Sequence, residues 1–236
     1  MKMITSNSIK DVVCCLIEAN DFSKAPLLAS IAKEEGAGYS EIRIPLETTL
    51  AGLKPLFDLK GRIILAVDPR ILREGMPESN ELINQTQTVI SNIVNLDIYG
   101  LELNYKLSIE FIKDIITILE DEKTISIVAK YFDHFPSKEE VEIIAQELKE
   151  LDSSLIKLVI PVSTKFQALE VLGYHKLFKE NEVIIVCSGQ EGKIAQSLTP
   201  FYGSKFTYGY LSSESDEALT SLNYLKKSIN SLIAMR

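Results

Sequence analysis

The chain has 236 residues, of which 46% are hydrophobic and 25% are charged, and its formal net charge is -8 at pH 7. A chain of this length and composition can bury a core without disulfide staples, which argues against intrinsic disorder and a disulfide scaffold. The acid excess also argues against general DNA or RNA binding, which needs a basic surface.

The sequence does not indicate a membrane-spanning or a metal-binding protein either. No apolar run reaches the roughly 18 residues of a membrane span, and no apolar signal segment follows the first residues. The cysteines are Cys14, Cys15 and Cys187, an odd number without the spacing of a metal site. This usage predicts a reduced, cytoplasmic protein with no metal and no membrane partner.

Short β-branched apolar runs alternate with longer stretches of helical period. The runs predict eight strands, at residues 12–17, 39–44, 62–67, 98–103, 124–129, 155–160, 183–187 and 206–210. Several are apolar throughout, which is typical of parallel strands covered on both faces. Between them, Ser137 and Glu140 form a capping-box pattern that predicts a helix start. The last helix is expected from about residue 216 to residue 233.

Eight strands, each followed by a helix, predict an α/β fold, a (β/α)8 TIM barrel forming a single domain over residues 1–236. The rival fold is a doubly wound open sheet, which a Gly-rich turn after the first strand would favour. Residues 18–26 contain no glycine, so neither a dinucleotide fingerprint nor a P-loop is present.

Charged residues occur within strands that should be dry. Glu41 and Arg43 are two residues apart and share one strand face, Glu102 lies between two leucines, and Lys157 lies between Ile156 and Leu158. Because side chains alternate across a barrel strand, we expect these four charges to point inward near the strands' C-terminal ends. Barrel enzymes place their active sites at that end.

Lys157 is the sharpest candidate. Burial of an ammonium group lowers its pKa, and a neutral lysine amine attacks ketones and aldehydes to form a Schiff base. The alternative is a structural ion pair of Lys157 with Glu102 or Glu41. The strand pattern leaves both interpretations open.

Other candidates lie in predicted loops. His134 follows the fifth strand and is either a general base or a loop histidine bonded to backbone. Arg70 and Glu74 follow the third strand. An arginine there can hold a carboxylate by paired hydrogen bonds, although a charged loop is often only solvated.

With these positions assembled, the chain resembles the type I 3-dehydroquinate dehydratases, the Schiff-base enzymes of the shikimate pathway. The resemblance covers most of the chain. It rests on the order and spacing of Glu41-Ile42-Arg43, Arg70 to Gly75, Leu101-Glu102-Leu103, and Lys157 to Pro161.

The resemblance implies a mechanism and a set of roles. Lys157 attacks the C3 ketone of the small-molecule substrate 3-dehydroquinate, the iminium acidifies the C2 proton, and the C1 hydroxyl leaves as water. Arg43 and Arg70 hold polar groups of the ring, Glu74 orients the base, and Glu41 supports the site. No metal or cofactor is required, and a homodimer is an expectation from the resemblance alone.

The chain departs from the family pattern at three places. Lys130 or a neighbour stands where the family has its catalytic histidine, which makes His134 or Lys130 the candidate base. Gln196 stands where the family has an arginine that grips the substrate carboxylate. The lid retains a serine in the segment that includes Ser215 but lacks the family's Pro-Gly-Gln.

Three interpretations follow. The first, which we favour, is an active dehydratase with a rearranged site. The second is a binding relative that lost turnover. The neutral amide of Gln196 does not replace an arginine guanidinium, which holds a carboxylate by two parallel hydrogen bonds. The third is another Schiff-base barrel enzyme of the aldolase type, since barrels host many chemistries.

Overall fold

The computed structural model describes residues 9, 11–18, 22–46, 48–49, 51–57, 62–67, 80–94, 96–179, 182–211 and 219–235. Within these residues the parallel strands are β1 (Val13–Ile17), β2 (Tyr39–Ile44), β3 (Ile63–Val67), β4 (Gly100–Asn104), β5 (Ile125–Tyr131), β6 (Leu155–Pro161), β7 (Val183–Ser188), β8 (Thr207–Tyr210) and β9 (Thr220–Ser221). The α-helices are α1 (Ala25–Glu34), α2 (Lys54–Phe57), α3 (Asn80–Ile93), α4 (Ile109–Asp121), α5 (Lys138–Lys149), α6 (Lys165–Tyr174), α7 (Gly192–Tyr202) and α8 (Leu222–Ala234). Short 3-10 turns, η2 (Phe22–Lys24) and η4 (His175–Leu177), precede α1 and follow α6.

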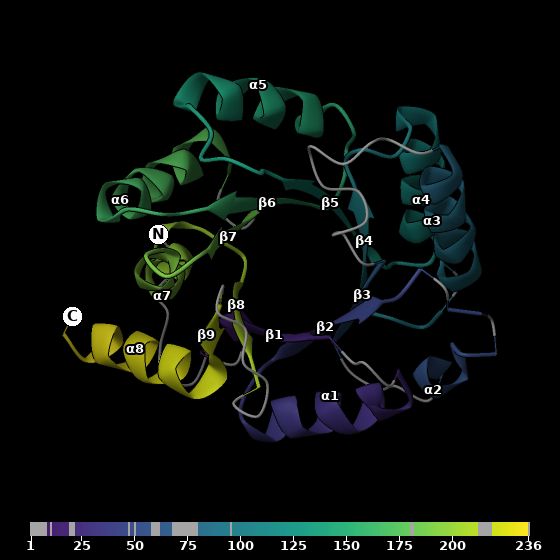
Figure 1. Ribbon diagram of the computed structural model, residues 1–236, viewed down its shortest axis with the longest axis horizontal. Coiled ribbons are helices and arrows are strands. Elements are labelled where there is room, and N and C mark those ends of the chain that lie inside the picture. Colours follow the sequence, from purple (N-terminus) through teal and green to yellow (C-terminus); the bar gives the residue numbers. More distant parts are fainter. Residues whose placement is uncertain are drawn as a thin grey trace.

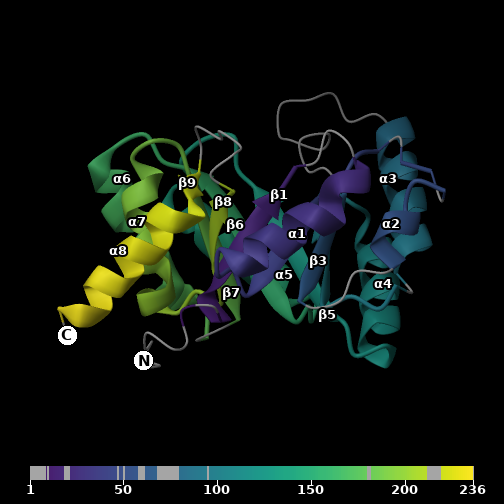
Figure 2. The ribbon, with the colours of Figure 1, turned by 90° about the horizontal axis from the view of Figure 1, so that it is seen from below.

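The strands form one curled sheet in the order β7-β6-β5-β4-β3-β2-β1-β8-β9. Figure 1 looks down this ring of strands and shows the helices outside it. From the side, α1 and α8 lie in front of the strands (Figure 2). The predicted (β/α)8 barrel-like fold is confirmed.

The ring closes between β7 and β8 through a single parallel bridge, Val183 with Ser204. Gly203 ends α7 in the left-handed region, at a φ of 112°, which turns the chain toward that bridge. The Lys205 backbone N–H then donates to the Val183 carbonyl at 2.8 Å. These contacts hold β7 beside the start of β8, where no longer ladder forms between them in the described residues.

Two layers of buried side chains follow from the alternation of each strand. One layer fills the ring, with Ile64, Ile127, Ile184 and Phe206 among its members. The other lies between strands and helices. The strands are therefore covered on both faces, as their apolar sequences predict.

The helix boundaries follow local capping. Ser137 caps α5 by accepting a hydrogen bond from the Glu140 N–H at 3.2 Å, as the sequence predicts. The predicted start of the last helix at about residue 216 is wrong. Thr220 belongs to the short strand β9 and pairs with Gly209 of β8, and Ser221 then caps α8. Among the described helices, none has both the length and the apolar character that a bilayer span requires.

Candidate active site

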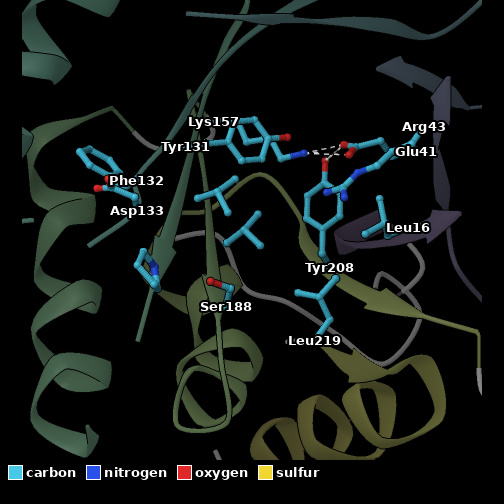
Figure 3. Close-up of a pocket in the computed structure, with 13 residues that line it drawn as sticks. Leu16, Glu41, Arg43, Tyr131, Phe132, Asp133, Lys157, Ser188, Tyr208 and Leu219 are labelled. Carbon is cyan, nitrogen blue, oxygen red and sulfur yellow. Dashed lines mark hydrogen bonds and ion pairs between the residues drawn. The ribbon is translucent and has the colours of Figure 1, made fainter. Parts of the chain in front are cut away.

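A cavity of about 380 Å³ opens among the inner faces of β1, β2, β5, β6, β7 and β8. Its polar lining consists of Glu41, Arg43, Tyr131, Asp133, Lys157, Ser188 and Tyr208 (Figure 3). Several of these residues stand at or near the C-terminal ends of their strands. The strand alternation therefore gathers polar groups at the end of the barrel where active sites lie.

Lys157 is bound by two carboxylates from distant strands. Its Nζ donates to Glu41 Oε1 at 2.9 Å and Oε2 at 2.7 Å, and to Glu102 Oε2 at 2.6 Å. The Lys157 side chain is 2% exposed, and those of Glu41 and Glu102 are 0% and 2% exposed. The ammonium also lies 4.4 Å from the centre of the Tyr208 ring.

These contacts correct the expected protonation of Lys157. Burial alone lowers the pKa of this ammonium, but attraction to Glu102 and Glu41 outweighs burial, and the net pKa lies above the usual value. The expectation of a lowered pKa is therefore wrong. The ion pairs offered as the alternative are present, and they hold the amine charged.

The two carboxylates differ in their affinity for a proton. Burial raises the pKa of Glu41, but Lys157 and Arg43 outweigh it and the net pKa is lowered. Burial also raises the pKa of Glu102, where repulsion from Glu41 adds to it, and the net pKa is raised despite Lys157. Glu102 is thus the better proton acceptor of the two.

Each carboxylate also accepts a hydrogen bond from a tyrosine. Tyr131 donates to Glu102 Oε1 at 2.6 Å, and Tyr208 donates to Glu41 Oε2 at 2.6 Å. Burial and the neighbouring carboxylates raise the pKa of both phenols well above the usual value. Both are therefore neutral donors in the substrate-free site.

Arg43 lines the cavity from β2 and forms an ion pair with Glu18. Burial lowers its pKa, but Tyr131, Glu41, Glu18 and Glu102 reverse that effect and raise it. The Arg43 Nε is buried and has no hydrogen-bond partner among the described residues. A guanidinium cation thus lines the cavity.

The end of β5 places the two candidate bases away from the cavity lining. Lys130 is 8% exposed and lies over the rings of Tyr105 and Phe132, at 5.3 and 5.4 Å from their centres. The His134 side chain is 56% exposed, with Nδ1 2.6 Å from Asp133 and Nε2 3.1 Å from Glu140. From this segment Tyr131, Phe132 and Asp133 line the cavity, and of these Tyr131 shares the hydrogen-bonded carboxylate of Glu102 with Lys157.

Gln196 lies on α7, is fully buried, and does not belong to the cavity lining. Its amide nitrogen and oxygen have no hydrogen-bond partner within the described part of the chain. The remaining predicted site residues, Arg70, Glu74 and Ser215, lie outside the described residues.

Neither Tyr131 nor Tyr208 is among the site residues predicted from the sequence. The register supplies the missing signal for Tyr131. Ala129 pairs with Lys157 and Tyr131 pairs with Val159, so Tyr131 shares the inner face while Lys130 pairs with Leu158 on the outer face. Continuing the predicted strand by two residues would have indicated Tyr131.

No group of three or more histidine, cysteine or acidic side chains in the described ranges is arranged to hold a metal ion. The charges at the site are instead paired with one another. Its chemical resources are one lysine amine, the carboxylates of Glu41, Glu102 and Asp133, two phenols and an arginine.

A family model and several solved structures match the chain. The family model described as type I 3-dehydroquinase matches residues 13–234. No curated protein matches the chain.

Several solved structures share the fold. A type I 3-dehydroquinate dehydratase from Clostridium difficile, with covalently modified comenic acid, superposes with a TM-score of 0.79 at 17% identity, covering 96% of this chain and 94% of that one. The 3-dehydroquinate dehydratase from Enterococcus faecalis gives 0.75 at 16% identity, covering 98% and 99%. The enzyme from Geobacillus kaustophilus gives 0.74 at 16% identity, covering 95% and 91%.

Proposed function

Because the chain belongs to the type I 3-dehydroquinase family, we propose that it is a hydro-lyase that converts 3-dehydroquinate to 3-dehydroshikimate through a Schiff base on Lys157. The observation that carries the proposal is the Lys157 amine, buried beside a cavity of about 380 Å³ and bonded to Glu102. The reaction is a step of the shikimate pathway, which leads to chorismate and the aromatic amino acids.

The first step frees the amine. Only a neutral amine attacks a ketone, and Lys157 begins protonated. One proton moves from Nζ to Glu102 Oε2 along the 2.6 Å hydrogen bond, which the raised pKa of Glu102 favours. The amine then adds to C3, and the carbonyl oxygen takes one proton from the attacking nitrogen and one from Glu102 and leaves as water. An iminium remains, and Glu102 is again a carboxylate.

The iminium draws electrons from the neighbouring C2–H bond. Loss of that proton gives an enamine, and departure of the C1 hydroxyl as water regenerates a conjugated iminium. Addition of water at C3 then releases the product and returns the Lys157 amine. Glu41 keeps its negative charge throughout, because its pKa is lowered, and this charge stabilises the cationic intermediates.

Arg43 is proposed to bind a polar group of the substrate. Its side chain lines the cavity and is 14% exposed, while Glu18 holds Nη1 of the guanidinium. Substrate binding by Arg70 and Ser215, and orientation of the base by Glu74, remain predictions from the family resemblance.

Borohydride trapping tests this function. Wild-type protein mixed with 3-dehydroquinate and borohydride should gain the mass of one reduced adduct, mapped to Lys157, and should form the conjugated product without reductant. Lys157→Met should show neither result, whereas Lys165→Met, which removes an exposed lysine of α6, should show both. A wild-type protein that gives no adduct and no product would refute the proposal. Trapping with other carbonyl compounds alone would favour the aldolase-type alternative.

A second candidate is a dehydratase-like protein that binds substrate without turnover. The buried, unpartnered amide of Gln196 favours it, because this side chain is neutral and outside the cavity lining. An adduct on Lys157 without product would support this candidate.

Assembly and location remain part of the proposal. A homodimer and a cytoplasmic protein are both expected, and neither nucleic acid nor membrane is expected as a partner. Sedimentation velocity at several concentrations tests the dimer, and fractionation of the source cells tests the location.

A further inference from the structure

We infer that Tyr131 and Glu102 form the proton relay of this site: the Tyr131 oxygen takes the substrate's C2 proton while its own proton passes to Glu102 Oε1. This inference rests on the proposed function and assigns the base that the sequence left open between His134 and Lys130.

The position of Tyr131 follows from strand register. It is the last residue of β5 and pairs with Val159, and both residues line the cavity that contains Lys157. In Figure 3 the Tyr131 ring overlaps the Lys157 side chain in projection, and the hydrogen bonds of both residues to Glu102 place them close together. A substrate joined to Nζ is therefore formed next to this phenol.

Glu102 connects the phenol to the amine. Its Oε1 accepts from Tyr131 and its Oε2 accepts from Lys157, each at 2.6 Å. The Schiff base joins Nζ to C3 of the substrate, and C2 is bonded directly to C3. The proton to be removed thus lies near the group that already shares a carboxylate with the nucleophile, as general-base catalysis requires.

Tyr208 has the same kind of hydrogen bond but a different acceptor behind it. Its partner Glu41 also faces Lys157 and Arg43, and the lowered pKa of Glu41 disfavours uptake of a proton. The raised pKa of Glu102 favours that uptake. Tyr208 is also 1% exposed, whereas Tyr131 is only partly buried. Tyr131 is therefore the phenol with a proton acceptor behind it.

The relay balances over both halves of the elimination. When the C2–H bond breaks, its electron pair forms the C2=C3 bond of the enamine, one proton goes to Tyr131, and the phenolic proton goes to Glu102. In the second half Glu102 returns a proton to Tyr131, and Tyr131 protonates the C1 hydroxyl. That hydroxyl leaves as water while C1=C2 and the iminium form. The phenol is neutral before and after, so its raised pKa does not prevent the transfer.

The test separates proton transfer from Schiff-base formation. In Tyr131→Phe the yield of reduced adduct on Lys157 should stay within about twofold of the wild-type yield. The value of kcat should fall by about 100-fold or more, with KM changed much less. Exchange of the C2 proton in heavy water should fall in parallel. Tyr224→Phe, which alters a tyrosine that is 61% exposed on α8, should match wild type in every measurement.

Tyr131→His gives an independent readout. An imidazole at this position should restore at least tenfold of the lost turnover, and its kcat should gain an ionisation near pH 6.5 that wild type lacks. A Tyr131→Phe enzyme within threefold of wild-type kcat would overturn the relay and leave the Schiff-base function standing. A wild-type protein with neither adduct nor product would overturn both.

Discussion

Lys157 on β6 donates two of its three hydrogen bonds to the two carboxylate oxygens of Glu41 on β2, at 2.9 and 2.7 Å, across 116 positions of sequence. A buried pair of this kind is not evidence of high stability by itself, because both charges are removed from water. It fixes the amine at the centre of the barrel and keeps it charged until a proton acceptor takes a proton. The two carboxylates therefore have separate roles: Glu41 keeps its negative charge, and Glu102 accepts a proton.

Glu41→Gln should move Schiff-base formation to lower pH. Loss of this anionic neighbour removes an attraction that stabilises the ammonium, so the pKa of Lys157 falls. An opposite charge at this range shifts a pKa by about 1–3 units. The midpoint of the borohydride-trapping rate against pH should accordingly fall by at least about one unit.

The same substitution should also destabilise the fold. Breaking a buried ion pair costs about 3–5 kcal/mol. Urea unfolding at pH 7 should show the free energy of unfolding of Glu41→Gln lowered by this amount. Glu150→Gln, an exposed change after α5, should alter neither measurement. An unchanged trapping midpoint in Glu41→Gln would show that Glu41 does not control the charge of Lys157.

His134→Ala should retain turnover within about twofold of wild type. The His134 ring is largely exposed and is not part of the cavity lining, and its nitrogens contact Asp133 and Glu140. Steady-state kinetics at saturating substrate checks this expectation. A loss of 100-fold or more, with the Lys157 adduct intact, would return the role of base to His134.

His175 should make the protein less stable in mild acid. It is 5% exposed, and burial lowers its pKa to about 4 despite its hydrogen bond to the Leu172 carbonyl. The neutral ring is therefore favoured in the folded state. Stability from this group is present above about pH 6.5 and is lost as pH falls toward 4, by about 2 kcal/mol between pH 7 and pH 5.

His175→Gln should remove that part of the pH dependence, measured as the difference in the free energy of unfolding between pH 7 and pH 5. His134→Gln is a matched control with the opposite sign. The Asp133 and Glu140 hydrogen bonds raise the pKa of His134, so its contribution is present at low pH and is lost as pH rises. Equal pH dependence in wild type and His175→Gln would contradict the assignment.

The strands and the inner charges could be predicted because both depend on local alternation. The second predicted strand coincides with β2, Tyr39–Ile44, and the period of two placed Glu41 and Arg43 on one face. The start of α8 could not be predicted in this way. It depends on the pairing of Thr220 in β9 with Gly209 in β8, a contact between two strands that the local sequence pattern does not contain.

The chemistry of the site depends on contacts that no local pattern contains. Burial of Lys157 was visible in its strand, but its protonation depends on carboxylates 116 and 55 positions away. The choice of Tyr131 over Lys130 depends on the pairing of Ala129 with Lys157, which is fixed only when β5 and β6 come together. Register therefore determines the candidate base, and composition does not.

Gln196→Met should stabilise the protein. The Gln196 side chain is fully buried and both amide atoms have no hydrogen-bond partner in the described residues. An unsatisfied buried amide costs about 1–3 kcal/mol, and methionine fills a similar volume without polar atoms other than sulfur. The backbone should stay in place, because the Thr199 and Thr207 hydroxyls both donate to the Gln196 carbonyl, at 3.1 and 2.7 Å.

Urea unfolding should show the free energy of unfolding of Gln196→Met raised by about 1–3 kcal/mol. The control Gln146→Met, at an exposed position of α5, should stay within about 0.5 kcal/mol of wild type.

Kinetics on the same variants tests the predicted role of Gln196 in substrate binding. If Gln196 contacts the substrate, KM should rise by tenfold or more, because the amide donor is lost. If it does not, KM stays unchanged and the carboxylate must be bound by another cation, for which Arg43 is the described candidate because it lines the cavity.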